Sequence, residues 1–146
     1  MSATPREKLY SPTLLGLATQ LAKYPLHDDL SQVGEAHSRT CGSSVVCGLK
    51  SDANGRLSEL GLRTSACAVG QAAAAIFAQN AEGHDQAALD EYILAIEDWL
   101  GGKGHQPDWP GIDALQPAIA FPARHAAILL AWKAASEALS KARVAS

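Results

Sequence analysis

Residues 45–63 constrain the fold more than any other segment, because their pattern is that of a β-hairpin. Apolar residues alternate at the start of this segment, namely Val45, Cys47 and Leu49. Residues 52–55 read Asp-Ala-Asn-Gly, which is turn chemistry, and a second strand-like run follows at 56–63. A further strand at 32–38 is more weakly marked. This half of the chain is therefore expected to form an antiparallel sheet.

After Cys67 the sequence changes to residues that favour helices. An alanine-rich run begins there and ends at residues 80–83, and Asp85 can then cap a second helix that Gly101 ends. The apolar stripe of this second helix consists of Leu89, Ile93, Ile96 and Leu100. A last helix is predicted to start at Pro122. Its buried stripe consists of Ile128, Trp132, Ala135 and Leu139. Strands followed by helices indicate the α+β class.

One helix is expected before the sheet. Residues 1–9 are predominantly polar and are predicted to be disordered, at the start of a single domain that spans residues 1–146. The Ser-Pro pair at 11–12 offers a helix cap with proline in the first helical position. The Tyr-Pro pair at 24–25 ends that helix, because the residue before proline avoids the helical conformation.

The charge balance excludes several classes of partner. Of the 146 residues, 12 are basic and 15 acidic, which gives a formal net charge of −3. Without a basic run, the chain lacks the footprint of a protein that binds nucleic acid or an anionic membrane. No stretch reaches the ~20 apolar residues of a membrane span, and the N-terminus lacks a secretory pattern. We therefore expect a cytoplasmic protein, in which three cysteines without paired spacing stay reduced.

The three cysteines differ in their expected surroundings. Cys41 lies in a short polar segment before the hairpin, and Cys67 lies where the second hairpin strand meets the alanine-rich helix. The exposed amides and the dipole of a helix start favour a thiolate, which is both a nucleophile and a metal ligand. Cys47 is expected to be a small core residue. From the residues alone, Cys41 and Cys67 are either buried inert thiols or functional ones.

Five segments resemble one protein family. They are Cys-Gly at 41–42 with the strand that follows, Asn-Gly-Arg-Leu at 54–57, Ala-Cys-Ala-Val-Gly-Gln-Ala at 66–72, Phe-Pro-Ala-Arg at 121–124 and Leu-Ala-Trp-Lys-Ala at 130–134. The chain is similar to the U-type iron-sulfur cluster assembly scaffolds, which are IscU, SufU and the NifU N-terminal domain. The last two segments resemble the SufU-type branch. This resemblance covers nearly the whole chain and implies a SufE/NifU-like fold, with an antiparallel sheet of about three strands packed by helices.

The resemblance also implies a site in which three cysteines and an aspartate hold a nascent iron-sulfur cluster or a zinc ion. Cys41 and Cys67 stand at two of the cysteine positions. The aspartate of the family's Cys-Gly-Asp motif is replaced by Ser43. The third cysteine, three residues after an arginine, falls on Ala127. Two of the four expected ligands are therefore missing.

Such a partial site would bind metal weakly. A complete zinc site contributes about 10 to 16 kcal/mol, so half of it leaves about 5 to 8 kcal/mol, a dissociation constant between roughly micromolar and sub-millimolar. His125 is a candidate replacement ligand two residues before Ala127, and His37 is a weaker one. Residues two apart on a helix point about 200° from each other, so His125 serves only if the helix starts later.

The resemblance therefore predicts a scaffold-like protein of iron-sulfur cluster assembly that is not an enzyme. It would bind iron, zinc or a nascent cluster through Cys41 and Cys67, and accept sulfur from a cysteine desulfurase. Cluster-accepting proteins are further expected partners, and two copies in a homodimer could pool their cysteines. The alternative is a diverged paralogue that acts as an interaction or regulatory module of the assembly machinery without binding metal.

Overall fold

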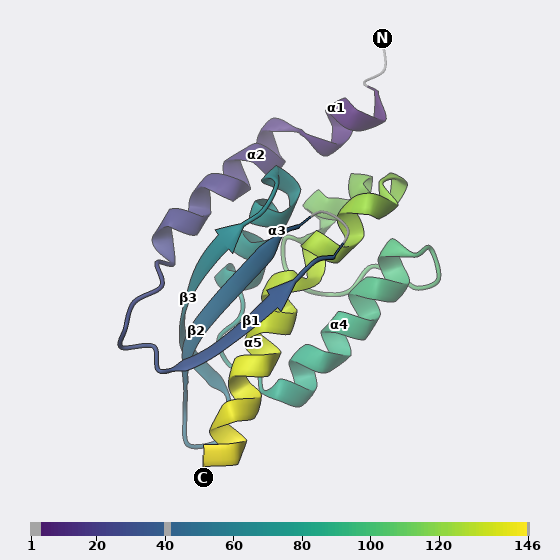
Figure 1. Cartoon of the computed structure of the whole chain (residues 1–146). Coiled ribbons are helices and arrows are strands. Elements are labelled where there is room, and N and C mark those ends of the chain that lie inside the picture. Colours follow the sequence, from purple (N-terminus) through teal and green to yellow (C-terminus); the bar gives the residue numbers. More distant parts are fainter. Residues whose placement is uncertain (1–3, 40–41, 146) are drawn as a thin grey trace.

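The computed structural model describes residues 4–39 and 42–145, which form an α+β fold (Figure 1). Its sheet consists of β1 (Gln32–His37), β2 (Ser44–Ser51) and β3 (Leu57–Ser65), which are antiparallel and lie in the order β1-β2-β3. The predicted fold class is confirmed, and so is the strand that the sequence marks only weakly.

The hairpin of β2 and β3 is held by its turn. One oxygen of Asp52, Oδ1, accepts the backbone N–H of Asn54 at 2.8 Å and that of Arg56 at 3.0 Å. Gly55 has a φ of 78°, a conformation that glycine adopts at little cost. All three side chains expected on one face of β2 are buried, namely Val45, Cys47 and Leu49. The turn therefore sets the register that buries this face.

The N-terminal segment is helical, so the prediction of disorder over residues 1–9 is wrong for its described part. Helix α1 (Pro5–Leu9) begins with a capping box, in which Thr4 Oγ1 accepts the backbone N–H of Glu7 at 3.1 Å. Leu9 is fully buried in the core. A capping box and one buried leucine thus order a segment whose composition is polar.

The second helix starts where the sequence predicts, but its α-helical part ends at Thr19, before the predicted end at Tyr24. Helix α2 (Pro12–Thr19) begins after Ser11, whose Oγ accepts a backbone N–H of the first turn at 3.1 Å. A 3-10 segment, η1 (Gln20–Lys23), continues it as far as Tyr24. The Tyr24 carbonyl accepts the backbone N–H of Leu62 at 2.8 Å, so the end of this helical region is attached to β3.

The C-terminal half is helical, as predicted. Its elements are α3 (Ala68–Gln79), α4 (Gln86–Leu100), the 3-10 segments η2 (Ile112–Ala120) and η3 (Pro122–Arg124), and α5 (His125–Ala145). The last α-helix begins at His125 and not at the predicted Pro122, because residues 122–124 form a 3-10 turn. Within the described part of the chain, no helix is both long and apolar enough to cross a membrane.

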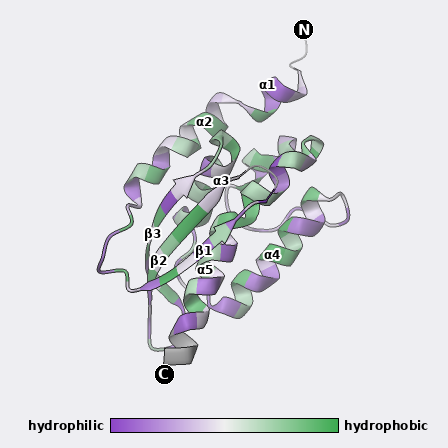
Figure 2. Cartoon of the chain, in the orientation of Figure 1, coloured by the Kyte–Doolittle hydropathy of each residue, from purple (hydrophilic) through white to green (hydrophobic). Residues whose placement is uncertain are grey.

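Helix α5 is the element on which the other layers pack. It contacts β1 and β2 on one side and α3 and α4 on others, while α3 also packs against α2 (Figure 1). The middle of β2 is hydrophobic (Figure 2). A group of three aromatic residues fills the core between the helices, with ring centroids 5.2 to 5.6 Å apart: Phe77, Trp109 and Trp132.

Gly34 of β1 allows an unusually close approach of α5 to the sheet. A Cβ atom at this position would overlap the carbonyl oxygen of Ala134 and lie 2.5 Å from the backbone nitrogen of Ala138. Both obstacles are main-chain atoms of the helix, which cannot turn aside as a long side chain would. The strand and the helix are therefore in backbone contact at this point.

Gly34→Ala should lower the free energy of unfolding by about 1–3 kcal/mol, because β1 and α5 must separate to admit the methyl group. Gly16 lies in α2, and a methyl group added there would have nothing within 4 Å, so this position offers a matched control. Gly16→Ala should raise the free energy of unfolding by about 0.5–1 kcal/mol. Urea denaturation of both variants measures these changes, and equal stability of Gly34→Ala and the wild type would contradict the packing described.

Candidate functional site

The segment that enters β2 and the segment that leaves β3 lie at the same end of the sheet. Ser44 at the start of β2 pairs with Ser65 at the end of β3. Before β2, the loop is closed by the backbone N–H of Ser38, which donates to the carbonyl of Ser43 at 2.8 Å. Cys41, one of the two predicted thiol ligands, lies outside the described residues. The structure thus describes Arg39 and Gly42 but neither Thr40 nor Cys41.

Cys67 lies at this same end of the sheet, at the N-cap of α3. Only Ala66 and Cys67 connect β3 to α3. The Cys67 thiol is free and half-buried, and it makes no hydrogen bond to the N–H groups of the first helical turn. Its predicted place between strand and helix is confirmed, and its side chain is not used to cap the helix.

The position expected for a third cysteine lies beside the first turn of α3. Ala127 is 1% exposed. A Cβ atom on Gly70 would lie 3.5 Å from the Cβ of Ala127 and 2.9 Å from that of Ala66. The fold therefore brings position 127 close to the helical turn that follows Cys67. In this chain, small apolar side chains fill that space.

Ser43 stands where the family's motif has an aspartate. It is 5% exposed and is the last residue before β2. Its hydroxyl is a neutral oxygen, which lacks the charge with which a carboxylate attracts a cation. The substitution therefore removes a negative charge from this end of the sheet.

His125, the predicted replacement ligand, is the first residue of α5 and is engaged elsewhere. Its Nε2 lies 2.8 Å from the carbonyl oxygen of Ala118, so Nε2 carries the proton and donates. Because α5 begins at His125, two residues before Ala127, the two side chains leave the helix about 200° apart. The second alternative, His37, is exposed on β1, with Nε2 2.9 Å from Glu35 Oε1.

The described residues do not assemble a complete metal site. Within residues 4–39 and 42–145, there is no group of three or more His, Cys, Asp or Glu side chains placed to hold one ion. Zinc in proteins normally takes four such ligands, and clusters are held by several thiolates. Cys67 together with Cys41 would supply two thiolates at most, so a single copy does not fit a four-ligand site.

Cys47 is a core residue, as predicted. Its side chain is fully buried in β2, and burial raises the pKa of the thiol from 9.0 to about 12. The thiol is therefore protonated and inert in the folded chain at neutral pH. Of the two cysteines whose surroundings the structure describes, only Cys67 is available for chemistry.

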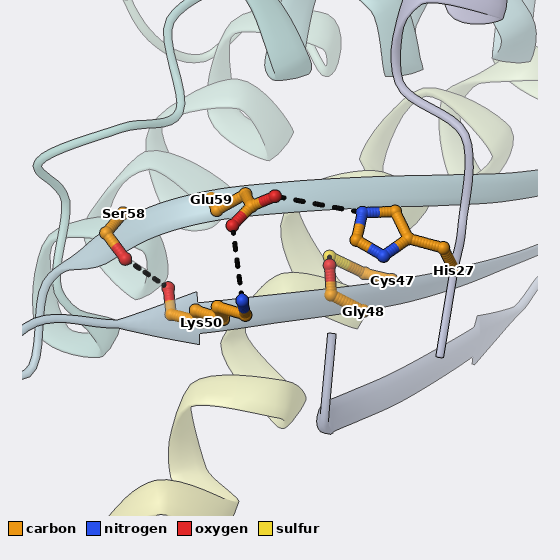
Figure 3. A network of polar contacts seen from close by, with 6 residues as sticks. All are labelled: His27, Cys47, Gly48, Lys50, Ser58 and Glu59. Carbon is orange, nitrogen blue, oxygen red and sulfur yellow. Dashed lines mark hydrogen bonds and ion pairs between the residues drawn. The ribbon is translucent and has the colours of Figure 1, made fainter. Parts of the chain in front are cut away.

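A polar cluster at the opposite end of the hairpin is separate from this site (Figure 3). Glu59 lies 3.6 Å from Lys50 Nζ and 3.7 Å from His27 Nε2. These side chains are about half exposed, and ion pairs of that kind contribute little to stability. The cluster lies near the turn of the hairpin, whereas Cys67 lies beyond the other end of β3.

Gln71 lies near the site, and the sequence motifs do not single it out as a functional residue. Its side-chain Nε2 donates to the carbonyl of Ala66 at 2.8 Å, and its backbone N–H donates to the carbonyl of Cys67 at 2.9 Å. The signal in the sequence was its place four residues after Cys67, because a helical residue at that distance lies over the N-cap.

Solved structures with the same fold were found. A NifU-like protein (N-terminal) from Brucella abortus is 25% identical, with a TM-score of 0.85 over 98% of this chain and 100% of its own. A SUF-system protein from Fervidobacterium islandicum, described as an iron-sulfur cluster assembly scaffold, is 20% identical, with a TM-score of 0.77 over 91% of this chain and 98% of its own. A protein described only as hypothetical is 19% identical, with a TM-score of 0.64.

No family model and no curated protein matches the sequence. The similarity between this chain and those proteins is thus visible in its fold and in the order of its short sequence segments. One structure is named as a NifU-like protein and the other as a scaffold of the SUF system, which are the kinds of protein that the sequence resembles, so the predicted resemblance is confirmed.

Iodoacetamide at pH 8 should modify Cys67 in the native chain and leave Cys47 unmodified until the chain unfolds. Cys47 is protected because its pKa of about 12 leaves almost no thiolate and because its sulfur is buried. Mass spectrometry of the digested chain measures both rates. Equal labelling of the two cysteines under native conditions would contradict this assignment.

Between pH 9 and pH 12 the unfolded chain loses a proton from Cys47 that the folded chain keeps. The contribution of Cys47 to the free energy of unfolding should therefore fall as the pH rises through this range.

Proposed function

We propose that this chain, a structural relative of the U-type iron-sulfur cluster assembly scaffolds, acts in iron-sulfur cluster assembly as a scaffold-type protein. The observation that carries the proposal is the fold, which the chain shares over 98% of its length with the NifU-like structure at 25% identity. Scaffold proteins of the NifU and SufU type are not enzymes, which supports the prediction that this chain is not one either. Its partners would be a cysteine desulfurase and proteins that accept clusters.

Cys67 is the residue that we propose accepts sulfur from the desulfurase. Its thiolate would attack the terminal sulfur of a persulfide carried on a cysteine of the desulfurase. The S–S bond of the desulfurase breaks, an S–S bond forms at Cys67, and the cysteine of the desulfurase leaves as a thiolate. The exchange is balanced and needs no added oxidant. The half-buried thiol at the start of α3 supports this role, since its sulfur is not committed to a helix cap.

Metal would be held weakly by one copy, through Cys41 and Cys67. Ala127 and Ser43 supply no thiolate and no carboxylate, and the described residues hold no group of three ligands. A second copy or a partner protein would have to complete the ligand set.

The second candidate function, an interaction module of the assembly machinery that binds no metal, is favoured by one observation. Small residues pack tightly where the third ligand would lie, with Ala127 against Gly70.

Incubation with a cysteine desulfurase and free cysteine should place one extra sulfur atom on Cys67, seen as an increase of about 32 Da on its peptide, the mass of the sulfur transferred by the exchange. The measurement is mass spectrometry after blocking free thiols. Cys67→Ser should abolish this transfer, and Cys47→Ser should leave it intact because Cys47 is buried. Sulfur that appears only on Cys41, or on no cysteine, would refute the assignment of Cys67 as acceptor.

Ala127→Cys should tighten zinc binding by about a hundredfold, because one added thiolate contributes about 3 kcal/mol. The added thiol would lie beside the first turn of α3, which position 127 faces at Gly70. Ala126→Cys is the matched control, since its side chain leaves α5 about 100° away. Competition with a coloured chelator measures both affinities. Equal affinities of the two variants would contradict the placement of the site. No measurable zinc binding by the wild-type chain would favour the interaction module.

A further inference from the structure

The two edges of the sheet differ in what covers them. On its side away from β2, strand β3 is bonded to two other segments. The backbone N–H of Leu62 donates to the carbonyl of Tyr24 at 2.8 Å, and that of Leu57 donates to the carbonyl of His84 at 2.8 Å. Strand β1 forms the other edge (Figure 1), and none of the described strands pairs with it there. Because an unpaired edge is a template for a further strand, β1 is where another chain can join this sheet.

Alternate backbone groups of β1 point away from β2 and toward this open edge. The backbone N–H of Ser38, just after β1, donates to the carbonyl of Ser43 at 2.8 Å, so Ser38 faces the chain that enters β2. In an extended strand the backbone groups of successive residues face opposite edges. The N–H and carbonyl groups of Glu35 and His37 therefore face the open edge.

Lys141 closes one end of the open edge. Its Nζ, in the C-terminal part of α5, donates to the carbonyl of Val33 at 2.5 Å. Val33 lies two residues before Glu35, so its carbonyl faces the same edge, as the alternation requires. The stretch of β1 that stays open for pairing therefore consists of Glu35 and His37.

The side chains of this open stretch are complementary to those of a second copy. Glu35 and His37 lie on the same face of β1, and both are more than half exposed, with His37 Nε2 2.9 Å from Glu35 Oε1. If two copies pair antiparallel about a two-fold axis at Ala36, Glu35 of each copy lies opposite His37 of the other. Directly opposite acidic and basic side chains stabilise a strand pair.

The neighbouring registers are less favourable. An axis at Glu35 would place two carboxylates opposite each other and would pair Val33, whose carbonyl is already occupied. An axis at His37 would pair Glu35 with Arg39, which lies beyond the end of β1. With the axis at Ala36, both pairs of Glu35 and His37 exchange their backbone hydrogen bonds within β1.

We propose that a second copy of this chain pairs with the open edge of β1, in the register that places Glu35 opposite His37. The two sheets then form one continuous sheet in the order β3-β2-β1-β1-β2-β3. At about 4.8 Å between neighbouring strands, the two β3 strands lie ~24 Å apart. Because each Cys67 follows its own β3, the two Cys67 thiols do not share one metal ion. The dimer is independent of sulfur acceptance by Cys67, and a partner protein is left to complete the ligand set.

The first test is the oligomeric state of the full chain, measured by sedimentation velocity over a concentration series. A reducing agent and EDTA exclude dimers held by a disulfide or by metal. The wild type should dimerise as its concentration rises. Glu35→Lys should raise the dissociation constant of the dimer at least about tenfold, because it removes the carboxylate opposite His37 twice in a two-fold dimer. His37→Glu should have the same effect, because it places a carboxylate opposite Glu35.

A charge exchange tests the register. The variant that combines Glu35→Lys with His37→Glu restores opposite charges, so its dissociation constant should return to within about threefold of that of the wild type. Glu82→Lys is the matched control, since it makes the same change of charge at an exposed residue between α3 and α4 and should leave the dimer unchanged. Protection of the buried Cys47 from alkylation verifies that each variant folds. A wild-type chain that stays monomeric up to ~1 mM, or a charge exchange that does not restore the dimer, would overturn the proposal.

Amide hydrogen exchange followed by NMR locates the interface. The N–H groups of Glu35 and His37 face the open edge, so their exchange should slow as the dimer forms, whereas that of Ala36, which faces β2, should be slow at every concentration. A dimer in which the Glu35 and His37 amides stay unprotected would place the interface elsewhere and refute the proposal. Protection that appears only after a desulfurase is added would assign the edge to that protein and would refute it as well.

Discussion

The backbone contact between β1 and α5 is the constraint on which the rest of the structure depends. Gly34 lets the helix lie against the strand at main-chain distance, and the alanines at 134 and 138 keep the facing side of the helix flat. With α5 held at this depth, its first turn reaches the start of α3, where Ala127 meets Gly70. The same helix supports α4 on another side. A contact far from the site along α5 thus determines which residues meet at the site.

The residues at that end of the sheet combine a reactive position with an incomplete set of ligands. Cys67 keeps an uncommitted thiol at a helix start, whereas positions 43 and 127 carry a hydroxyl and a methyl group. Sulfur transfer needs one thiolate, but cluster binding needs several donors at once. Loss of two metal-binding groups therefore weakens cluster binding far more than it weakens sulfur transfer. This difference is why we place sulfur acceptance at the centre of the proposed function.

The sequence predicted the fold well where one local signal dominates. The turn at 52–55 and the caps at Ser11 and Asp85 lie where the sequence indicates, because each involves hydrogen bonds between residues close in sequence. The prediction failed at residues 4–9, where composition concealed a capping box and a buried leucine. It also placed the start of the last helix at Pro122, since a 3-10 turn and an α-helix share the same first-position preference for proline. At the site, spacing located Cys67 but not the contact of Gln71 with Ala66, which depends on how the helix meets the strand.

The connection between β3 and α3 has a mechanical consequence. This connection consists of two residues, and the side chain of Gln71 donates a hydrogen bond to the carbonyl of Ala66. The start of α3 therefore has almost no freedom to move relative to the sheet. A protein that binds to the sheet would therefore also set the distance between its own reactive group and the sulfur of Cys67. Delivery to this thiol would depend on rigid-body alignment of the two surfaces, because the connection between β3 and α3 would not move to correct a poor fit.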